Sequence, residues 1–385
     1  MNRQAPENTR YFEKILTQRL AEKLNFLQVL IGPRQVGKTT AVTRIFDSWS
    51  GPKKMISADL PTPPDHTWLT AHWNDAATRG DDVLFVVDEV HKVTGWNEVI
   101  KALFDRVRSA RQMRVVLLGS ASLTIQRGLG ESLAGRYELL KANHWSFGEC
   151  VRAFGLSFEE FLRFGGYPAA LELRTEPERW RAYVRDSIIE PVLGRDLLGH
   201  SRVNKPALFR QLFEIAMQYP AQVVSYNKLL GQLQERGNTD TIKDYLQLLE
   251  GGFLLKQLHK YSRGVISTKT SSPKILPMDL ALVAALSRSR GQESDPAWRG
   301  RLIESAFGAH LARQGGELYY WADGRFDVDF VHEHDGILTA YEVKSGRERD
   351  GKGLMAFAAR YPEAVTRLVT DSEIEEILRA GSSGG

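Results

Sequence analysis

Short apolar runs alternate with helical stretches in the first 145 residues of this 385-residue chain. Residues 26–31, 83–87 and 114–118 are apolar runs with the length of buried strands. Helical spacing of apolar positions follows at residues 39–49 and 96–108. Further elements are expected as a helix at 11–24 and strands at 54–59 and 138–140. Strands that alternate with helices predict a parallel sheet covered by helices, which is an α/β fold.

The pattern changes after residue 206. An apolar stripe predicts a helix from residue 206, a second helix begins near residue 224, and Thr239 starts a third after a cluster of capping residues. A pair of glycines ends the third helix, and a strand pair follows up to residue 261. Three helices and a hairpin in this order predict a winged helix-turn-helix, whose third helix would enter a nucleic-acid groove.

A third pattern occupies the last hundred residues. Residues 300–311 have helical periodicity, and strands are expected at 318–321 and 326–331. The sequence His-Asp-Gly at 334–336 is a strong hairpin signal, so the next strand should return at 338–345. His332 and His334 flank this turn, and we expect surface residues there, because no cysteine or regular ligand spacing accompanies them.

Composition narrows the setting. The chain is 42% hydrophobic and 25% charged, as is usual for globular proteins, and no apolar run has the length of a membrane span. A single cysteine, Cys150, allows no internal disulfide, so we expect a cytoplasmic protein. The formal net charge is +4, but residues 201–275 hold 11 Lys and Arg against 5 Asp and Glu. This basic excess either contacts a polyanion, nucleic acid first, or is a solvated surface.

A glycine-rich loop follows the first predicted strand and precedes a helix. It reads G-x-x-x-x-G-K-T, and its residues are Gly32, Pro33, Arg34, Gln35, Val36, Gly37, Lys38, Thr39 and Thr40. The backbone N–H groups of such a loop and the helix N-terminus face phosphate. Lys38 can reach the β- and γ-phosphates of ATP, and the Thr39 hydroxyl is an expected Mg²⁺ ligand. The alternative, a chance glycine turn, fits the flanking strand and helix less well.

Two acids end the second central strand. Asp88 is expected to complete the Mg²⁺ shell, and Glu89 to polarise the attacking water. Carboxyl ends of strands are where α/β sheets place their ligands. Ser120 ends the next strand and is either a sensor of the γ-phosphate or a helix N-cap without a catalytic part. Together these motifs predict ATP hydrolysis with ATP and Mg²⁺ as cofactors.

Acids and a lysine also meet in the C-terminal pattern. Glu342 and Lys344 are two residues apart on one strand, so their side chains share a face. Asp329 lies on the partner strand, and Glu304 on the preceding helix can add a third carboxylate. Three carboxylates can hold Mg²⁺, and a lysine beside them can stabilise charge on a phosphate. The alternative is a domain of the same fold that does not cut.

The phosphate loop, Asp88-Glu89, Gly119-Ser120 and the segment 132–136 together resemble an AAA-type (AAA+) ATPase. More narrowly, the chain resembles archaeal and bacterial ATPases whose C-terminal half is a conserved domain of unknown function. This resemblance spans residues 11–345 and implies a restriction-endonuclease-like, PD-(D/E)xK core around Glu342 and Lys344. It also implies that Arg136 is an arginine finger in a homo-oligomer, with a hexamer as one candidate. A structural arginine paired with an acid of its own domain is the alternative.

Four domains follow from these observations. Residues 1–145 are expected to form the AAA+ P-loop ATPase core, 146–200 a helical lid and linker, 201–280 a winged-helix DNA-binding domain and 281–380 a nuclease-like domain. The resemblance places the glycine-rich element at 164–168 in the lid, whereas its residues alone predict only a tight turn. The expected DNA contacts are Lys228, Arg236, Lys243, Lys256, Lys260 and Arg263.

The leading hypothesis is an ATP-driven DNA-processing motor that binds duplex or branched DNA and has no membrane partner. Winged helices also serve as protein-interaction modules, so a second hypothesis is a nucleotide-gated signalling or defence ATPase whose C-terminal half binds a partner protein. A third is a metal-dependent DNA nuclease regulated by ATP.

Overall fold

The structure is a computed structural model that describes residues 9–22, 26–107, 113–120, 130, 132–198, 203–234, 237–263, 271–287, 295–344 and 351–381. The chain divides into two compact units. The N-terminal unit contains Met1–Asn143 and the short segment Gly194–His200. The C-terminal unit contains His144–Leu193 and Ser201–Gly385. Among the described residues, no helix combines the length and apolar character that crossing a membrane requires.

A five-stranded parallel sheet forms the centre of the N-terminal unit, with the order β2-β3-β4-β1-β5. Its strands are β1 (Leu27–Gly32), β2 (Lys53–Ser57), β3 (Val83–Asp88), β4 (Met113–Ser120) and β5 (Tyr137–Lys141). The strands β1 and β4 are buried along their whole length. Burial on both faces explains their continuous apolar sequences, and the predicted α/β fold is confirmed.

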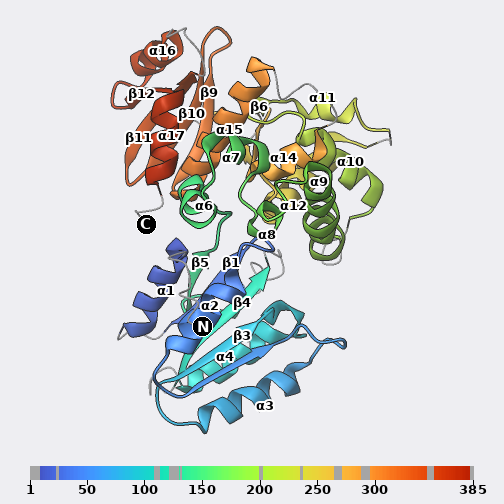
Figure 1. Ribbon diagram of the computed structural model, residues 1–385, viewed down its shortest axis with the longest axis vertical. Helices are drawn as coiled ribbons and strands as arrows, with labels where there is room; N and C mark the ends of the chain where they lie inside the picture. Colours follow the sequence, from blue (N-terminus) through green and yellow to red (C-terminus); the bar gives the residue numbers. More distant parts are fainter. Residues whose placement is uncertain are drawn as a thin grey trace. The chain divides into compact units, whose positions relative to one another are not determined.

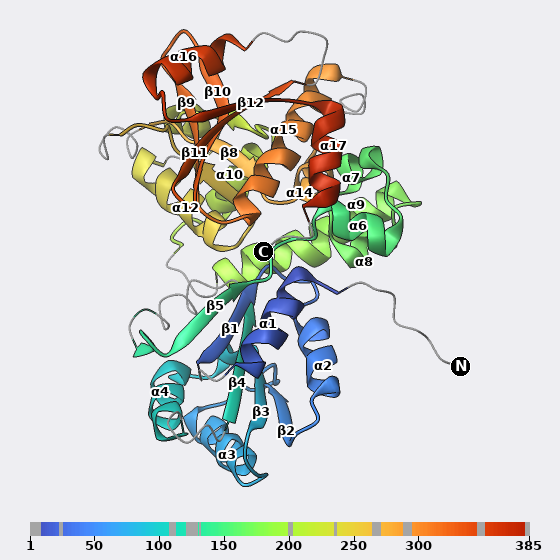
Figure 2. The ribbon, with the colours of Figure 1, turned by 90° about the vertical axis from the view of Figure 1, so that its left-hand side faces the viewer.

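Helices cover both faces of this sheet. They are α1 (Tyr11–Ala21), α2 (Lys38–Ser48), α3 (His66–Ala77) and α4 (Trp96–Val107), with a short 3₁₀ helix at Val90–Lys92. Figure 2 shows α2 and α4 on opposite sides of the strands. The sequence pattern did not predict α3, which Asp65 caps by accepting the Trp68 N–H at 3.0 Å. Apolar contacts of Leu69 and Trp73 bury one face of this helix.

The C-terminal unit begins with a group of helices. They are α6 (Phe147–Phe154), α7 (Phe158–Phe164), α8 (Pro168–Leu171) and α9 (Pro177–Tyr183), followed by π-helical segments at Val184–Ile189 and Val192–Leu197, the second of which runs on into Gly194–His200. The glycine pair 165–166 packs against α14 (Leu280–Leu286). A side chain at Gly165 would come within 2.1 Å of an Asp279 carboxylate oxygen, and Gly166 donates its N–H to Asp279 at 3.0 Å. The glycines therefore permit a close approach to this helix start.

Three helices and a small sheet come next in the chain. The helices are α10 (Pro206–Ala216), α11 (Tyr226–Leu230) and α12 (Thr239–Gly251). The strands β6 (Gln222–Val223), β7 (Leu255–Leu258) and β8 (Lys274–Pro277) form an antiparallel sheet with the order β6-β8-β7. The three predicted helices are present in the predicted order. The strand pair expected by residue 261 is only partly there, because β7 pairs with β8 beyond that residue, and β6 is an additional short strand. The winged-helix assignment itself stays a prediction.

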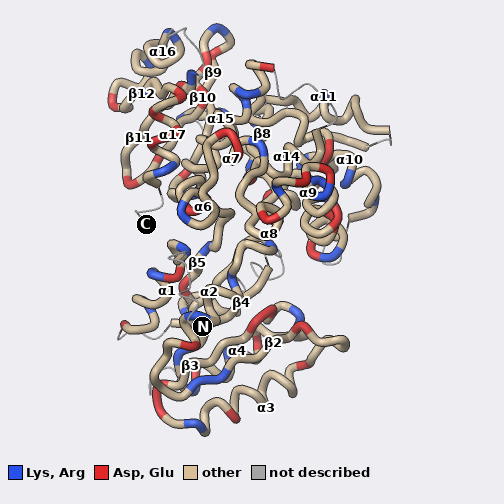
Figure 3. The backbone as a smooth tube through the Cα atoms, in the orientation of Figure 1, with Lys and Arg blue, Asp and Glu red and all other residues tan. Residues whose placement is uncertain are grey.

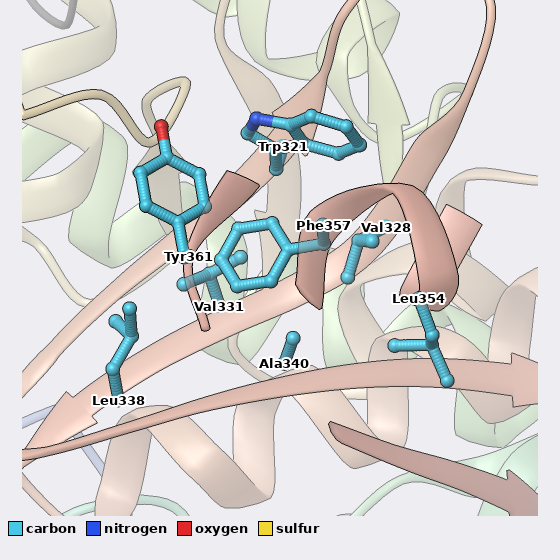
Figure 4. Close-up of a cluster of buried hydrophobic side chains, with 8 residues drawn as sticks. All are labelled: Trp321, Val328, Val331, Leu338, Ala340, Leu354, Phe357 and Tyr361. Atoms are coloured by element: carbon cyan, nitrogen blue, oxygen red, sulfur yellow. The ribbon is translucent and has the colours of Figure 1, made fainter. Parts of the chain in front are cut away.

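The last part is a four-stranded sheet with helices α15 (Pro296–Arg313), α16 (Lys352–Arg360) and α17 (Asp371–Ala380). Its order is β12-β11-β10-β9, where β9 is Glu317–Ala322, β10 Asp327–His334, β11 Ile337–Lys344 and β12 Val365–Thr370 (Figure 1). The predicted hairpin is confirmed, because Asp335 and Gly336 have the positive φ values that its turn requires. Figure 4 shows Phe357 of α16 between Trp321 and Tyr361 over the sheet.

Candidate active site

The phosphate loop joins β1 to α2, and the structure explains why both motif positions 32 and 37 require glycine. Gly37 has a φ of 89° and precedes the first residue of α2, a left-handed conformation that favours glycine. A side chain at Gly32 would lie 2.1 Å from the Ala142 carbonyl oxygen, so only glycine fits beside that backbone. Because α2 starts at Lys38, its free N–H groups face the loop, as anion binding requires.

Lys38 is buried and its ammonium bonds only to uncharged backbone oxygens among the described residues. It donates to the carbonyls of Gly32 at 2.9 Å and Pro33 at 2.8 Å. Burial lowers the pKa of Lys38 to about 8, although the nearby carboxylates Glu89 and Asp88 oppose this shift. A buried cation without a directly bound carboxylate is a site that gains stability when an anion such as a triphosphate enters.

Thr39 and Asp88 provide neighbouring oxygen atoms at the carboxyl end of the sheet. The Thr39 hydroxyl donates to Asp88 Oδ2 at 3.1 Å, and Asp88 Oδ1 accepts the Glu89 N–H at 3.0 Å. Burial, and then the charge of Glu89, raise the pKa of Asp88. A hydroxyl and a carboxylate in contact are the hard oxygen donors that Mg²⁺ prefers, so these residues fit the predicted ion.

Glu89 has a left-handed backbone with φ 51° and ψ 40°. Such a conformation costs a non-glycine residue about 1–3 kcal/mol and recurs at functional sites. It turns the carboxylate toward the end of β4, where Glu89 Oε2 accepts the Ser120 N–H at 3.4 Å. His91 Nδ1 lies 3.3 Å from the same oxygen. The Ser120 hydroxyl is buried and has no hydrogen-bond partner within the described part of the chain.

Arg34, in the middle of the phosphate loop, forms a bidentate ion pair with Asp196. Both nitrogen–oxygen distances are 2.6 Å, and the Asp196 side chain is 7% exposed. The hydrogen bond to Asp196 raises the pKa of Arg34, with smaller contributions from the charges of Glu89 and Asp59. Asp196 belongs to Gly194–His200, the segment of the N-terminal unit that interrupts the C-terminal unit in the sequence. A residue of the loop thus binds the connecting chain.

Arg136 pairs with an acid of its own unit. Its Nε and Nη2 donate to the two carboxylate oxygens of Asp105 on α4 at 2.7 and 2.9 Å. The Arg136 side chain is partly exposed, which agrees with either alternative from the sequence. A role as an arginine finger stays a prediction, and it requires this ion pair to open.

Two of the acids predicted for a nuclease core, Glu304 and Asp329, contact a lysine that the sequence did not indicate. Lys274 of β8 donates to a Glu304 carboxylate oxygen and to the Asp329 carbonyl oxygen, the latter at 3.0 Å. Its Nζ lies 3.6 Å from Asp329 Oδ1. Burial raises the pKa of Glu304, whereas Glu304 and Asp329 outweigh burial and raise the pKa of Lys274.

Glu342 and Lys344 pair with each other on β11, with Lys344 Nζ 2.8 Å from Glu342 Oε1. Asp329 Oδ2 accepts the Val343 N–H at 2.8 Å. The four predicted residues are therefore neighbours in one fold. Across the described ranges, however, no group of three or more His, Cys, Asp or Glu side chains is placed to hold a metal ion. His332 is buried, against the expectation of a surface residue, because its ring bonds to the Gly315 carbonyl at 2.7 Å.

Three of the six predicted DNA contacts have an acid within ion-pair distance. Lys243 pairs with Asp240 at 3.3 Å, Lys256 lies 3.9 Å from Glu250, and Arg263 pairs with Glu363. Lys228 lies over the Tyr219 ring, Lys260 pairs in a β-bridge, and Arg236 lies outside the described residues. Figure 3 shows acidic and basic positions interspersed along this unit. The basic excess in the sequence therefore gives no continuous basic run along the described chain.

The sequence predicted the motif residues of these sites, but it did not predict the residues that form ion pairs with them. Asp196 and Asp105 are far from Arg34 and Arg136 in sequence, and no local pattern marks them. The sequence contained a weak signal for Lys274. This lysine begins the short run Lys-Ile-Leu-Pro, and a lysine in a fully buried strand needs an acid partner.

Comparisons with known families agree with this organisation. Residues 25–162 match the model of an AAA domain, and residues 155–293 and 299–380 match two domains of unknown function, DUF8612 and DUF4143. The chain therefore combines a P-loop ATPase domain of the AAA class with a DUF4143 domain at its C-terminal end. The predicted resemblance is confirmed at this level.

Whole-chain relatives and solved structures were also found. Uncharacterized proteins of Mycobacterium tuberculosis and Mycobacterium bovis are each 29% identical over 325 residues, which is 82% of this chain and 69% of theirs. The RuvB Holliday junction branch migration motor of Thermotoga maritima is 17% identical, with a TM-score of 0.34 over 65% of this chain and 86% of that one. The Aeropyrum pernix ORC1 protein, solved with DNA, is 12% identical, with a TM-score of 0.32 over 74% and 92%. Similarity at this level carries no argument about function.

Proposed function

We propose that the chain is a magnesium-dependent ATPase that acts as a nucleotide-gated switch, in which ATP bound at residues 32–40 changes the state of the C-terminal unit. The ion pair between Arg34 and Asp196 carries this proposal. Arg34 belongs to the predicted phosphate loop, and Asp196 belongs to Gly194–His200, a short segment of the same unit that stands in the sequence between the two stretches of the C-terminal unit. Phosphate oxygens and the Asp196 carboxylate compete for one guanidinium, because both accept bidentate hydrogen bonds from arginine.

The residues of the site have separate tasks in hydrolysis. Lys38 would leave the carbonyls of Gly32 and Pro33 to bind the β- and γ-phosphates, and Thr39 with Asp88 would hold Mg²⁺. The ion, when bound, neutralises charge that develops on the phosphates. Glu89 polarises the water that attacks the γ-phosphorus. The Ser120 N–H donates to the Glu89 carboxylate at the end of β4, so the position of that carboxylate depends on the backbone of the strand, and His91 Nδ1 lies beside the same oxygen.

The exposed face of α12 favours a switch over a DNA reader. Its exposed residues are Asp240, Lys243, Asp244 and Gln247, and the lysine is already paired with Asp240. Carboxylates on a recognition helix repel the phosphate backbone, whereas a mixed polar face suits a protein partner. We therefore place the winged-helix-like part in the role of a partner-binding module.

A DNA-processing motor is the second candidate. In its favour, Lys228 and Lys260 form no ion pair within the described residues, and both belong to the predicted winged helix. Measuring the ATPase rate with duplex, junction and single-stranded DNA separates the candidates. Stimulation by one DNA structure would favour the motor, whereas a rate independent of all three supports the switch.

Hydrogen exchange tests the switch directly. We expect ATP, added to a Glu89→Gln variant that binds but does not hydrolyse it, to change the exchange of peptides that contain residues 192–198. The same change should disappear when Asp196→Asn is added, because the asparagine is similar in shape but lacks the charge that holds Arg34. Identical ATP-induced changes with and without Asp196→Asn would contradict coupling through this ion pair.

A further inference from the structure

We infer that the ammonium group of Lys274 occupies the position of a divalent cation in the acid cluster of the C-terminal α/β part, so that this nuclease-like core is held together without metal and does not cleave nucleic acid. The cluster consists of Lys274, Glu304, Asp329 and Glu342. This inference is independent of the proposed ATPase switch, because all four residues lie in the C-terminal unit.

The contacts of Lys274 are those of a cation between several oxygen ligands. Its Nζ bonds to a Glu304 oxygen and to the Asp329 carbonyl at 3.0 Å, and it lies 3.6 Å from Asp329 Oδ1. The ring of Phe330 faces the same ammonium with its centroid at 4.6 Å. The side chain is 6% exposed, so these groups replace nearly all of its hydration. An ammonium in this position leaves no place for a metal ion bound to the same carboxylates, because two cations that share these ligands would be close together and would repel strongly.

Further oxygens of Asp329 and Glu342 also have partners within the fold. Asp329 Oδ2 accepts the Val343 N–H at 2.8 Å and so ties β10 to β11. Glu342 Oε1 pairs with Lys344 at 2.8 Å. Glu342 Oε2 is buried and has no partner among the described residues, and it is the one oxygen of that carboxylate left for an outside ligand. One carboxylate oxygen is too few for Mg²⁺, which prefers near-octahedral oxygen ligands.

The contacts of Lys274 also join two parts of the C-terminal unit. Lys274 lies on β8, in the small sheet that also contains β6 and β7, whereas Glu304 lies on α15 and Asp329 on β10. The lysine therefore links the winged-helix-like part to the α/β part within one unit. A metal site at this point would need the link to open.

Binding of Mn²⁺, followed by electron paramagnetic resonance, tests the inference in the full chain. The Asp88→Asn substitution in every sample removes the predicted ion site of the ATPase domain. We expect no bound Mn²⁺ when Lys274 is present, and Mn²⁺ binding when Lys274→Ala frees the acids. Adding Asp329→Asn to Lys274→Ala should abolish that binding. Mn²⁺ should also raise the melting temperature of the Lys274→Ala variant but not that of the parent.

Two results would overturn the inference, and both are measured with Lys274 in place. One is Mn²⁺ binding that Asp329→Asn abolishes. The other is Mg²⁺- or Mn²⁺-dependent DNA cleavage by the wild-type chain that Asp329→Asn abolishes. These measurements hold even if Lys274→Ala does not fold. Lys256→Ala, on the neighbouring strand β7, is the matched control, since this lysine is partly exposed and 3.9 Å from its acid; it should bind no Mn²⁺.

Discussion

The phosphate loop and the acid cluster of the C-terminal unit each contain a buried lysine, but the two lysines have different partners. Lys38 in the phosphate loop donates to uncharged carbonyls, and its pKa is lowered to about 8 by burial. Lys274 in the C-terminal unit is just as buried, but it pairs with Glu304 and Asp329, which raise its pKa against the effect of burial. Within the described ranges, the ammonium of Lys38 has no carboxylate in direct contact, whereas that of Lys274 has two nearby carboxylates.

This difference teaches how to interpret an acid–lysine motif. Both regions bring carboxylates and a lysine together, and both motifs suggest phosphate chemistry. A site that binds a polyanion must leave its cation without a permanent carboxylate partner, since a satisfied ion pair gains little from a new ligand. By this criterion Lys38 is arranged for a ligand, and Lys274 is part of the fold.

The largest expected effect concerns Glu89. We predict that Glu89→Gln lowers ATP turnover by about 10²–10⁴-fold, because the amide cannot act as a general base. Affinity for ATP should change little, since the phosphate loop is untouched. Single-turnover hydrolysis and equilibrium ATP binding measure the two effects. Turnover that stays within a few-fold of wild type would show that Glu89 is not the base.

The second prediction concerns Lys274. Lys274→Ala leaves buried acids without their cation, so we expect a loss of about 3–5 kcal/mol in the free energy of unfolding. Lys274→Met combined with Glu304→Gln should lose less than the sum of the two single changes, with a coupling of about 0.5–3 kcal/mol. Urea unfolding of the wild type, of Lys274→Ala, of Lys274→Met, of Glu304→Gln and of the double variant measures both the loss and the coupling. Additive losses would show that the pair is not coupled.

The third prediction is a pH dependence of ATP binding. ATP adds negative charge beside Lys38 and so raises its pKa in the complex, which means that binding favours the protonated lysine. Below pH 8, titration of Lys38 should leave the affinity for ATP constant. Above pH 8, the affinity should fall by up to about tenfold per pH unit. Calorimetry at pH 8.5 in buffers of different ionisation enthalpy should detect proton uptake. Adenosine, which has no phosphate, is the control; uptake with adenosine, or none with ATP, would contradict the assignment.

The smallest expected effect is at an exposed lysine. Lys243 pairs with Asp240 three residues earlier on α12, and such surface pairs contribute about 0.5 kcal/mol or less. We expect Lys243→Ala to lower the free energy of unfolding by no more than this amount. We also expect it to leave any affinity for duplex DNA unchanged. A clear loss of DNA affinity, measured by fluorescence anisotropy, would instead support α12 as a reader of DNA.

The parallel sheet and its ATP site could be predicted because their signals are local. A buried strand followed by a glycine loop defines the position of Lys38, and Asp88 with Glu89 directly ends a second apolar strand. Parallel strands bring these ends to one edge, as the neighbours Gly32 and Ser120 on β1 and β4 show. The sequence alone therefore indicated nearly all the residues that the structure brings together in the candidate ATP site.

The ion-pair partners could not be predicted in the same way. Asp196 is 162 residues from Arg34, and Glu304 is 30 residues from Lys274. Which acid neutralises which cation depends on tertiary packing, and no periodicity encodes it. For the same reason the basic excess of residues 201–275 suggested DNA contacts, although acids such as Glu363 neutralise part of it in the fold.

The most direct test of the contrast between the two lysines is to titrate both in one sample. Nuclear magnetic resonance of lysine labelled with ¹³C at Cε reports each ammonium, and the Lys38→Arg and Lys274→Met variants assign the two signals. We predict that the Lys38 signal titrates near pH 8 and moves to higher pH when ATP is added. The Lys274 signal should stay that of a charged amine over the same range, with or without ATP. Loss of the proton from Lys274 near pH 8, or a Lys38 signal that ignores ATP, would contradict the account.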